Sequence, residues 1–363
     1  MVVISSAKLA KEVLKIQDLA FCSRPSFLGQ QKLSYNGHDI AFAPYNEYWK
    51  KMRKVCVTHL FSLKKVQSFS SIREDEVSRM IKKVSQQVAA SQITNLSNIV
   101  SSQTSTIICR IAFGIRYDEE AHEKRKLDQL LTLLQEMMTK FYFSDYFPLF
   151  GWLDELFGNI CILEKNFKDL DEFFEELIHQ HLNPNRPKSM EGDIIDLLLQ
   201  LRKEQSTSID LTLDNIKGIL MGEAQNNTSP LLIPRESIEK STLEGYEIQP
   251  GTIIHVNLWE IARDPEIWEN PKEFIPERFL NSDIDFKGQH FEFIPFGAGR
   301  RGCPGIALGV ATVNLILSNL LYAFDWELPY GMMKEDIDTD ILPGLAMHKK
   351  NALCLVPKNY PYT

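Results

Sequence analysis

Residues 296–305 read FGAGRRGCPG, and this segment constrains the fold more than any other part of the chain. It places one cysteine, Cys303, in a glycine-rich loop directly before a long apolar stretch that is predicted to be helical. The positive end of a helix dipole favours a thiolate, and the glycines let backbone N–H groups approach the sulfur. Arg301 adds a positive charge suited to a carboxylate of a ligand. The segment therefore indicates either a ligand-binding thiolate or a glycine-rich loop around an inert, buried cysteine.

The composition is that of a globular protein. Of the 363 residues, 44% are hydrophobic and 24% are charged, which excludes bulk disorder. The net charge of −8 argues against a protein that coats nucleic acid, so we expect no nucleic-acid partner. The six cysteines include no C-x-x-C pair, so no disulfide framework is predicted in a chain of this length.

Hydrophobic periodicity predicts a mainly α chain with a small β-sheet. The apolar stretch over 306–324 could be mistaken for a membrane span, but Asn314, Ser318 and Asn319 within it favour a buried core helix. The expected helices cover 62–91, 96–113, 126–143, 161–182, 193–203 and 306–322, and the expected strands cover 231–234, 251–258 and 352–356.

The cysteine segment matches the pattern F-x-x-G-x-R-x-C-x-G through Phe296, Gly299, Arg301, Cys303 and Gly305. This pattern resembles the haem-thiolate signature of the cytochrome P450 family. The resemblance implies the fold of that family, in an incomplete form, with Cys303 as the axial ligand of a haem b iron. It also implies that Phe296 shields the sulfur and that Arg301 pairs with a haem propionate.

Other segments resemble the family in the same order along the chain. WKKMR contains Trp49 and Arg53, which by resemblance hold a propionate, and LLIPRES contains Arg235, a third propionate partner. PERF contains Arg278, whose counterpart in the family locks the loop beneath the haem. Phrases such as SRPS, LSYNGHDIAFAPY and LPGLAMHKK are similar to the plant microsomal branch, most of all to its aldoxime-metabolising members.

Two elements of the family are not found at their expected places. One is the oxygen-binding helix, which reads approximately Ala/Gly-Gly-x-Asp/Glu-Thr-Thr/Ser. The other is a Glu-x-x-Arg helix, which the pairs Glu76–Arg79 and Glu260–Arg263 match only at the wrong positions, so both pairs are interpreted as solvated or local. Without that glutamate we expect Arg278 to keep an unpaired charge, and without the helix we expect no efficient oxygen activation.

The place of the missing elements is indicated by the sequence. LTLDNIKGILM resembles the start of the oxygen-binding helix, yet LLIPRES follows almost at once, so an internal deletion is expected near 221–230. We expect one domain over 1–363, with a helical part over 1–221 and the pocket strands, haem loop and last long helix over 222–363. Family members carry a membrane anchor in the endoplasmic reticulum, whereas this chain opens inside the first sheet, so a peripheral or cytosolic location is expected.

The resemblance implies a monooxygenase that inserts one atom of O2 into a small apolar organic substrate. Its electrons come from NADPH through a flavoprotein reductase. Two alternatives remain open: an inactive haem-binding fragment of a deleted or mis-spliced gene, and a helical interaction protein without a cofactor. One stretch between Trp49 and Ile72 is basic and is either the docking face for an acidic reductase or a solvated helix face; its bases are Lys50, Lys51, Arg53, Lys54, Lys64 and Lys65.

Overall fold

The computed structural model describes residues 1–117, 122–223, 231–342 and 348–360, and it confirms a mainly helical chain with small sheets. The helices are α1 (Ala7–Lys11), α2 (Leu28–Leu33), α3 (Glu47–Val55), α4 (Leu63–Ser68), α5 (Ser70–Ala89), α6 (Leu96–Phe113), α7 (His122–Thr139), α8 (Phe143–Tyr146), α9 (Trp152–Leu156), α10 (Asn159–Leu182), α11 (Ile194–Glu204), α12 (Leu213–Glu223), α13 (Leu258–Ile261) and α14 (Ile306–Ala323). The strands are β1 (Val2–Ile4), β2 (Thr94–Asn95), β3 (Arg235–Glu236), β4 (Ser241–Leu243), β5 (Tyr246–Ile248), β6 (Ile253–Val256), β7 (Phe324–Glu327), β8 (Ile341–Leu342), β9 (His348–Lys349) and β10 (Cys354–Asn359).

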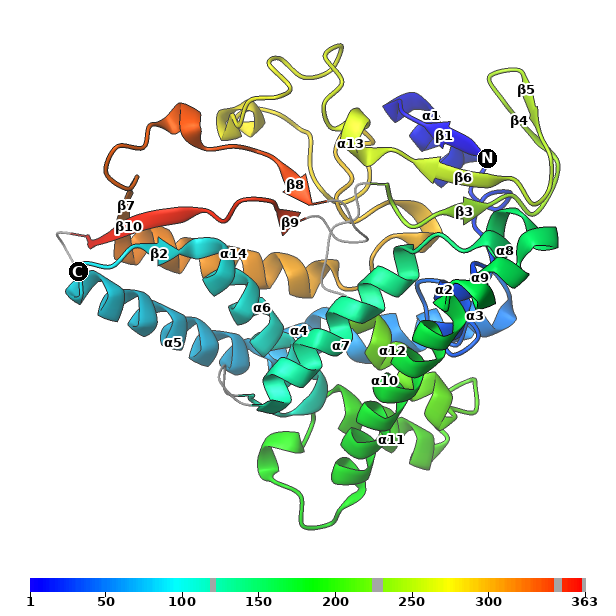
Figure 1. Ribbon diagram of the computed structural model, residues 1–363, viewed down its shortest axis with the longest axis horizontal. Helices are drawn as coiled ribbons and strands as arrows, with labels where there is room; N and C mark the ends of the chain where they lie inside the picture. The colour runs from blue at the N-terminus through cyan, green and yellow to red at the C-terminus, as the bar shows by residue number, and fades with distance from the viewer. Residues whose placement is uncertain (118–121, 224–230, 343–347, 361–363) are drawn as a thin grey trace.

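The strands form small sheets beside the helical body (Figure 1). In one of them β6 is central, with β1 parallel on one side and β3 antiparallel on the other. The first residues of the chain therefore lie in a sheet, as expected, and their partner β6 also pairs with the strand that carries Arg235. A second sheet has the order β2–β10–β7, and β4–β5 and β8–β9 form two-stranded ribbons.

The predicted elements are largely present, with shifted ends. Helix α6 matches its predicted range and ends at Gly114, which adopts a left-handed conformation with φ 64°. The single helix expected over 62–91 is instead α4 and α5, because the chain turns at Phe69, whose side chain is buried. The strand expected over 231–234 is wrong: the ladder begins at Arg235.

Helix α14 is only partly a core helix. Among the described residues it is the one helix long and apolar enough to cross a membrane, yet it packs along α5 (Figure 1). Leu308, Thr312, Ile316 and Leu320 are buried on one side. The opposite side exposes aliphatic residues, so the expectation of a fully buried helix is wrong for that side; the exposed residues include Val313, Leu317 and Leu321.

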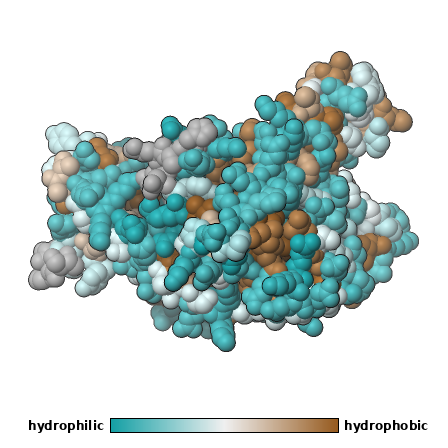
Figure 2. Space-filling view, turned by 90° about the horizontal axis from the view of Figure 1, so that it is seen from below, coloured by the Kyte–Doolittle hydropathy of each residue, from teal (hydrophilic) through white to brown (hydrophobic). Residues whose placement is uncertain are grey.

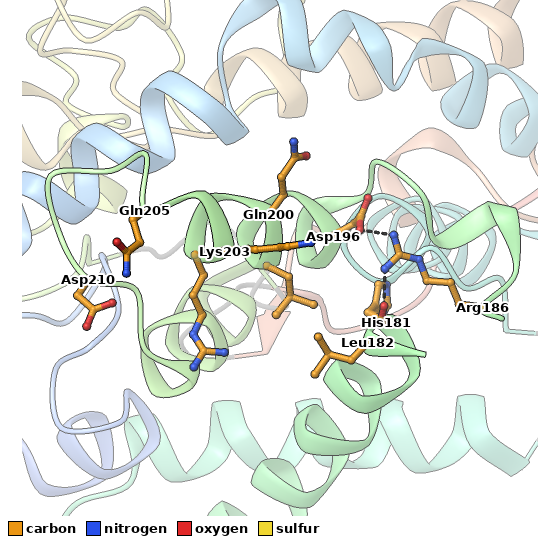
Figure 3. Close-up of a pocket in the computed structure, with 10 residues that line it drawn as sticks. His181, Leu182, Arg186, Asp196, Gln200, Lys203, Gln205 and Asp210 are labelled. Atoms are coloured by element: carbon orange, nitrogen blue, oxygen red, sulfur yellow. Dashed lines mark hydrogen bonds and ion pairs between the residues drawn. The ribbon is translucent and has the colours of Figure 1, made fainter. Parts of the chain in front are cut away.

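Helices α10 and α11 are joined by a buried ion pair. His181 Nε2 lies 2.7 Å from Asp193 Oδ2, and His181 Nδ1 lies 2.7 Å from the Leu177 carbonyl oxygen. A protonated imidazole can donate to both oxygens at once, which agrees with the raised pKa of His181. Arg186 bonds to the His181 carbonyl and to Asp196 beside the pair, and these residues line an open cavity of about 730 Å³ (Figure 3). His179 is exposed, and its Nε2 lies 3.8 Å from a carboxylate oxygen of Glu175.

Replacing His181 with glutamine is expected to lower the free energy of unfolding by about 2–4 kcal/mol at pH 6. Burial lowers the pKa of His181, but the hydrogen bond and charge of Asp193 outweigh burial and raise it above its ordinary value. The stabilisation is therefore complete below pH 6.5 and lost as the pH rises through the folded-state pKa. Urea unfolding of both proteins from pH 6 to 9 measures this; a difference that does not change with pH would contradict it.

Candidate functional site

Cys303 lies in the turn between a short 3₁₀ helix, Gly299–Arg301, and the N-terminus of α14. Its backbone N–H donates to the Phe296 carbonyl at 2.8 Å, which closes the loop. The side chain of Cys303 is exposed. Arg53 of α3 donates from Nη2 to the Gly302 carbonyl at 2.6 Å, so a helix far away in the sequence holds the residue that precedes the cysteine.

A close contact requires glycine at position 299 of this loop. Gly299 has φ +68°, and a Cβ built on it would lie 2.0 Å from the Leu14 carbonyl oxygen. A Cβ on Gly305 would lie 3.8 Å from Cys303 Sγ, and one on Gly309 would lie 3.4 Å from the Phe296 ring. The aromatic ring therefore packs against the first turns of α14, on the helix that follows the cysteine.

Three buried arginines gather behind the cysteine loop. Arg301 donates to the Cys22 and Ala43 carbonyls, and Arg235 of β3 donates to the Ala298 carbonyl. The third is Arg24, which donates to the carbonyls of Ala41, Ile233 and Pro234. The Nη1 atoms of Arg235 and Arg301 are buried and have no hydrogen-bond partner among the described residues.

The cluster of Arg24, Arg235 and Arg301, here called the arginine cluster, is electrostatically strained. Burial and then the charge of Arg235 lower the pKa of Arg301 to about 9. Burial lowers the pKa of Arg235 to about 10. Burial and the two neighbouring guanidinium charges also lower the pKa of Arg24 well below its ordinary value. Buried cations without matching anions are costly, so the cluster is suited to an anionic group.

Trp49 and Arg53 of α3 adjoin this cluster. The Arg301 guanidinium lies 4.0 Å from the centre of the Trp49 ring, and that of Arg53 lies 5.5 Å from it. The indole N–H donates to the Ile40 carbonyl at 2.9 Å. Trp49 thus offers the face of its ring to the arginines, while its N–H is engaged by the backbone.

Arg278 has no carboxylate partner among the described residues, as expected, but its guanidinium donates to the carbonyls of Glu269, Asn270, Glu273 and Ile275, so each of its nitrogens has a hydrogen-bond partner. Backbone carbonyls take the place of a carboxylate at these donors. The residue braces its own loop, 269–278.

The structure also shows what the residues of the two displaced Glu-x-x-Arg matches contact. Glu76 is 1% exposed and binds Arg110 and Arg116 at 2.6 and 2.9 Å, so the interpretation of Glu76 as part of a solvated or local pair is wrong. Arg79 instead binds Asp75 one helical turn away. Arg263 lies over the Trp259 ring at 3.4 Å, which is a local contact.

The residues present fit a haem. One exposed cysteine at a helix N-terminus can supply the axial thiolate, and the arginine cluster offers two unpartnered, buried N–H groups to two carboxylates. The structure brings together the cysteine loop, Trp49, Arg53, Arg235 and Arg301, for which the resemblance implied a role in haem binding. Arg278 is placed on a neighbouring loop.

Two residues of the site were missed from the sequence. Arg24 lies in the SRPS phrase and Asp39 in the HDIAFAPY phrase, and neither phrase was given a role. An arginine between apolar segments with no acid near it in sequence was the available signal for Arg24. For Asp39 it was a single acid directly before an apolar run, a pattern typical of a side chain that binds its own backbone.

Comparison with known proteins shows which family this chain is similar to. The family model described as "Cytochrome P450" matches residues 1–229 and 225–356. The chain is 44% identical to the 5-OH-xanthotoxin synthase of Pastinaca sativa over 427 positions, covering 99% of this chain and 84% of that protein. It is 42% identical to the 6,7,8-trihydroxycoumarin synthase of the same plant, with the same coverage. These names do not address the finer resemblance to aldoxime-metabolising members.

The fold is also similar to that of solved cytochrome P450 structures. A zebra fish cytochrome P450 solved with progesterone superimposes with a TM-score of 0.78 at 21% identity, covering 98% of this chain and 93% of that chain. The chain is also 38% identical to the strychnine-11-hydroxylase of Strychnos nux-vomica, over 98% of this chain and 82% of the relative. The chain therefore belongs to the cytochrome P450 family, a family of haem b monooxygenases that take electrons from NADPH through a reductase.

Proposed function

We propose that Cys303 is the axial ligand of a haem b and that the chain is a haem-thiolate monooxygenase scaffold. The observation that carries this proposal is the placement of Cys303 at the start of α14, two residues after the buried and partly unpartnered Arg301. When bound, haem supplies the activation of O2 that lets one oxygen atom enter an apolar molecule.

The surrounding residues have distinct roles in this proposal. Phe296, whose ring packs against α14 at Gly309, shields the sulfur, and Gly299 lets the loop approach Leu14, while Gly305 adjoins the Cys303 sulfur. Arg235 and Arg301 bind the propionates through their Nη1 atoms. These buried N–H donors have no acceptor among the described residues, and a carboxylate would supply one. Arg53 and Trp49 hold Gly302 and Arg301 in place, and Arg278 supports the neighbouring loop.

We propose a small, apolar plant metabolite as the substrate. The names of two relatives, 5-OH-xanthotoxin synthase and 6,7,8-trihydroxycoumarin synthase, refer to hydroxylated products. A third relative is called a hydroxylase of strychnine. These names support hydroxylation of a small ring compound.

A second candidate function is haem binding without efficient turnover. Helix α12 ends at Glu223, and β3 begins at Arg235, so few residues connect them. The family model matches in two pieces that meet at 225–229, and the 427-position alignment is longer than the 363-residue chain. These facts support one domain over 1–363 with an internal deletion near 221–230, where the residues that complete the distal wall and the Glu-x-x-Arg helix would stand.

We further propose that a flavoprotein reductase docks on α3 and α4. Lys51, Lys54 and Lys64 are exposed there, whereas Lys50 is paired with Glu47 and Lys65 donates to the Gly192 carbonyl. Arg53 of the same helix contacts Gly302, so the basic face adjoins the cysteine loop. An acidic partner is attracted to such a face, and salt weakens the attraction.

Reversing two of these charges, Lys51→Glu with Lys54→Glu, is expected to slow reduction by an added NADPH-dependent reductase about tenfold at low salt, with a smaller effect at high salt. Stopped-flow reduction of the haem measures the rate. The matched control reverses Lys188 and Lys203, which are exposed on the α10–α11 side of the molecule. Equal slowing in both double variants would contradict docking on α3.

The same assay with substrate separates the candidate functions. Hydroxylated product formed with NADPH consumption supports the monooxygenase. Reduction of haem without product supports the haem-binding chain whose distal wall is incomplete. A purified chain that takes up no haem contradicts both and leaves the helical interaction protein.

Plant members of the family are typically bound to the membrane of the endoplasmic reticulum. We propose that this chain meets a membrane peripherally, because apolar side chains are exposed across α8, the turn that follows it and α9: Tyr146, Phe147, Leu149, Phe150, Trp152, Leu156 and Phe157. Figure 2 shows hydrophobic residues at the surface of the face that it displays. Sedimentation with phospholipid vesicles distinguishes this from a cytosolic location.

A further inference from the structure

Three carbonyl groups of one short loop hold the side chains around the arginine cluster. The loop follows Asp39: the Ile40 carbonyl accepts from Trp49 Nε1 at 2.9 Å, and the Ala41 carbonyl accepts from Arg24 Nε at 2.8 Å. The Ala43 carbonyl accepts from Arg301 Nη2 at 2.7 Å. The direction of these carbonyls therefore sets where Trp49, Arg24 and Arg301 point.

The loop itself is held by Asp39. Its carboxylate is fully buried and accepts the backbone N–H groups of the next apolar residues, Ala41, Phe42 and Ala43, at 2.9–3.0 Å. Both carboxylate oxygens are used, and Phe42 N–H lies within reach of each. One side chain thus binds three successive N–H groups and turns the carbonyls on the other side of the chain toward the arginines.

The negative charge of Asp39 also offsets part of the positive charge of the arginine cluster. Burial raises its pKa to about 6, because the three N–H groups and the charge of Arg301 offset burial only in part. The group is therefore ionised at neutral pH. Its negative charge favours the charged forms of Arg24 and Arg301, which repel one another.

We propose that Asp39 is a positioning residue for the anionic end of the cofactor: it fixes the 40–43 loop so that Arg301, Arg24 and Trp49 present a rigid, correctly directed site to carboxylates. This inference rests on the proposed haem function. Asp39 touches no reacting group, and it acts through the Ala41 and Ala43 carbonyls.

The test uses the haem-loaded protein and the rate at which it loses haem to an excess of apomyoglobin. Asp39→Asn replaces one acceptor oxygen with an amide that cannot accept an N–H, so haem loss is expected to be about tenfold faster. Asp154→Asn is the matched control, because Asp154 is also fully buried and accepts the N–H groups of Phe143 and Ser144, in the α8–α9 region. It should lower the melting temperature similarly and leave the rate of haem loss unchanged.

A double-mutant cycle separates positioning from general stability. Arg301→Lys should speed haem loss about tenfold in the wild-type background and less than threefold when Asp39 is already asparagine, because the two residues act through one carbonyl. If Asp39→Asn is not recovered folded, Asp39→Ser, which keeps one acceptor, is measured in its place with the same expectation. Equal rates of haem loss in the Asp39 variant and the wild type, or fully additive effects with Arg301→Lys, would overturn the proposal. A wild-type chain without bound haem would instead overturn the proposed function.

Discussion

Replacing Gly299 with alanine is expected to abolish haem loading and to lower the free energy of unfolding by more than about 3 kcal/mol. Two independent costs add at this position. The backbone is left-handed at φ +68°, and a Cβ would meet the Leu14 carbonyl oxygen at 2.0 Å. Because Leu14 is fully buried, neither side can yield without opening the contact between the cysteine loop and the N-terminal helical segment.

Gly297 provides the matched control within the same loop. Its φ is +66°, but the nearest heavy atom to a built Cβ is 4.0 Å away. Gly297→Ala therefore carries only the conformational cost, about 1–2 kcal/mol, and should retain haem. Haem content and urea unfolding of the two purified variants measure the difference. Equal losses in both variants would show that the Leu14 contact does not matter.

Much of this site could be predicted because it is local in sequence. The spacing of Phe296, Gly299, Arg301, Cys303 and Gly305 indicated a cysteine loop directly before a helix, and the structure places that loop at the start of α14. Both ends of the helix over 96–113 could be predicted, because its apolar periodicity and its capping residue Gly114 lie within one short segment of the sequence.

The remainder depends on contacts between distant segments. Arg24 is held by carbonyls of residues 41, 233 and 234, and Asp39 matters only because its loop faces Arg301. The carbonyl partners of Arg278 follow no side-chain pattern, so the sequence could not show that the backbone would satisfy its N–H donors in the absence of a glutamate. Likewise, the exposure of one side of α14 depends on which other helices pack against it. The hydrophobic periodicity of the helix itself does not indicate this.

Replacing Cys303 with serine is expected to remove thiolate ligation completely. Serine preserves the size and the loop hydrogen bond from residue 303 to the Phe296 carbonyl, but a hydroxyl is not deprotonated at neutral pH and is a poor ligand for haem iron. The fold should persist, because the side chain of Cys303 is exposed. Cys161→Ser, at another exposed cysteine, is the control and should behave as the wild type.

Thiolate ligation by Cys303 is tested by the carbon monoxide difference spectrum of the reduced protein, purified from cells supplied with haem precursor. A Soret band at the position characteristic of a thiolate ligand is expected in the wild type and in Cys161→Ser, and no such band is expected in Cys303→Ser. A wild-type chain without bound haem, or a thiolate band that survives in Cys303→Ser, would contradict ligation of the haem by Cys303.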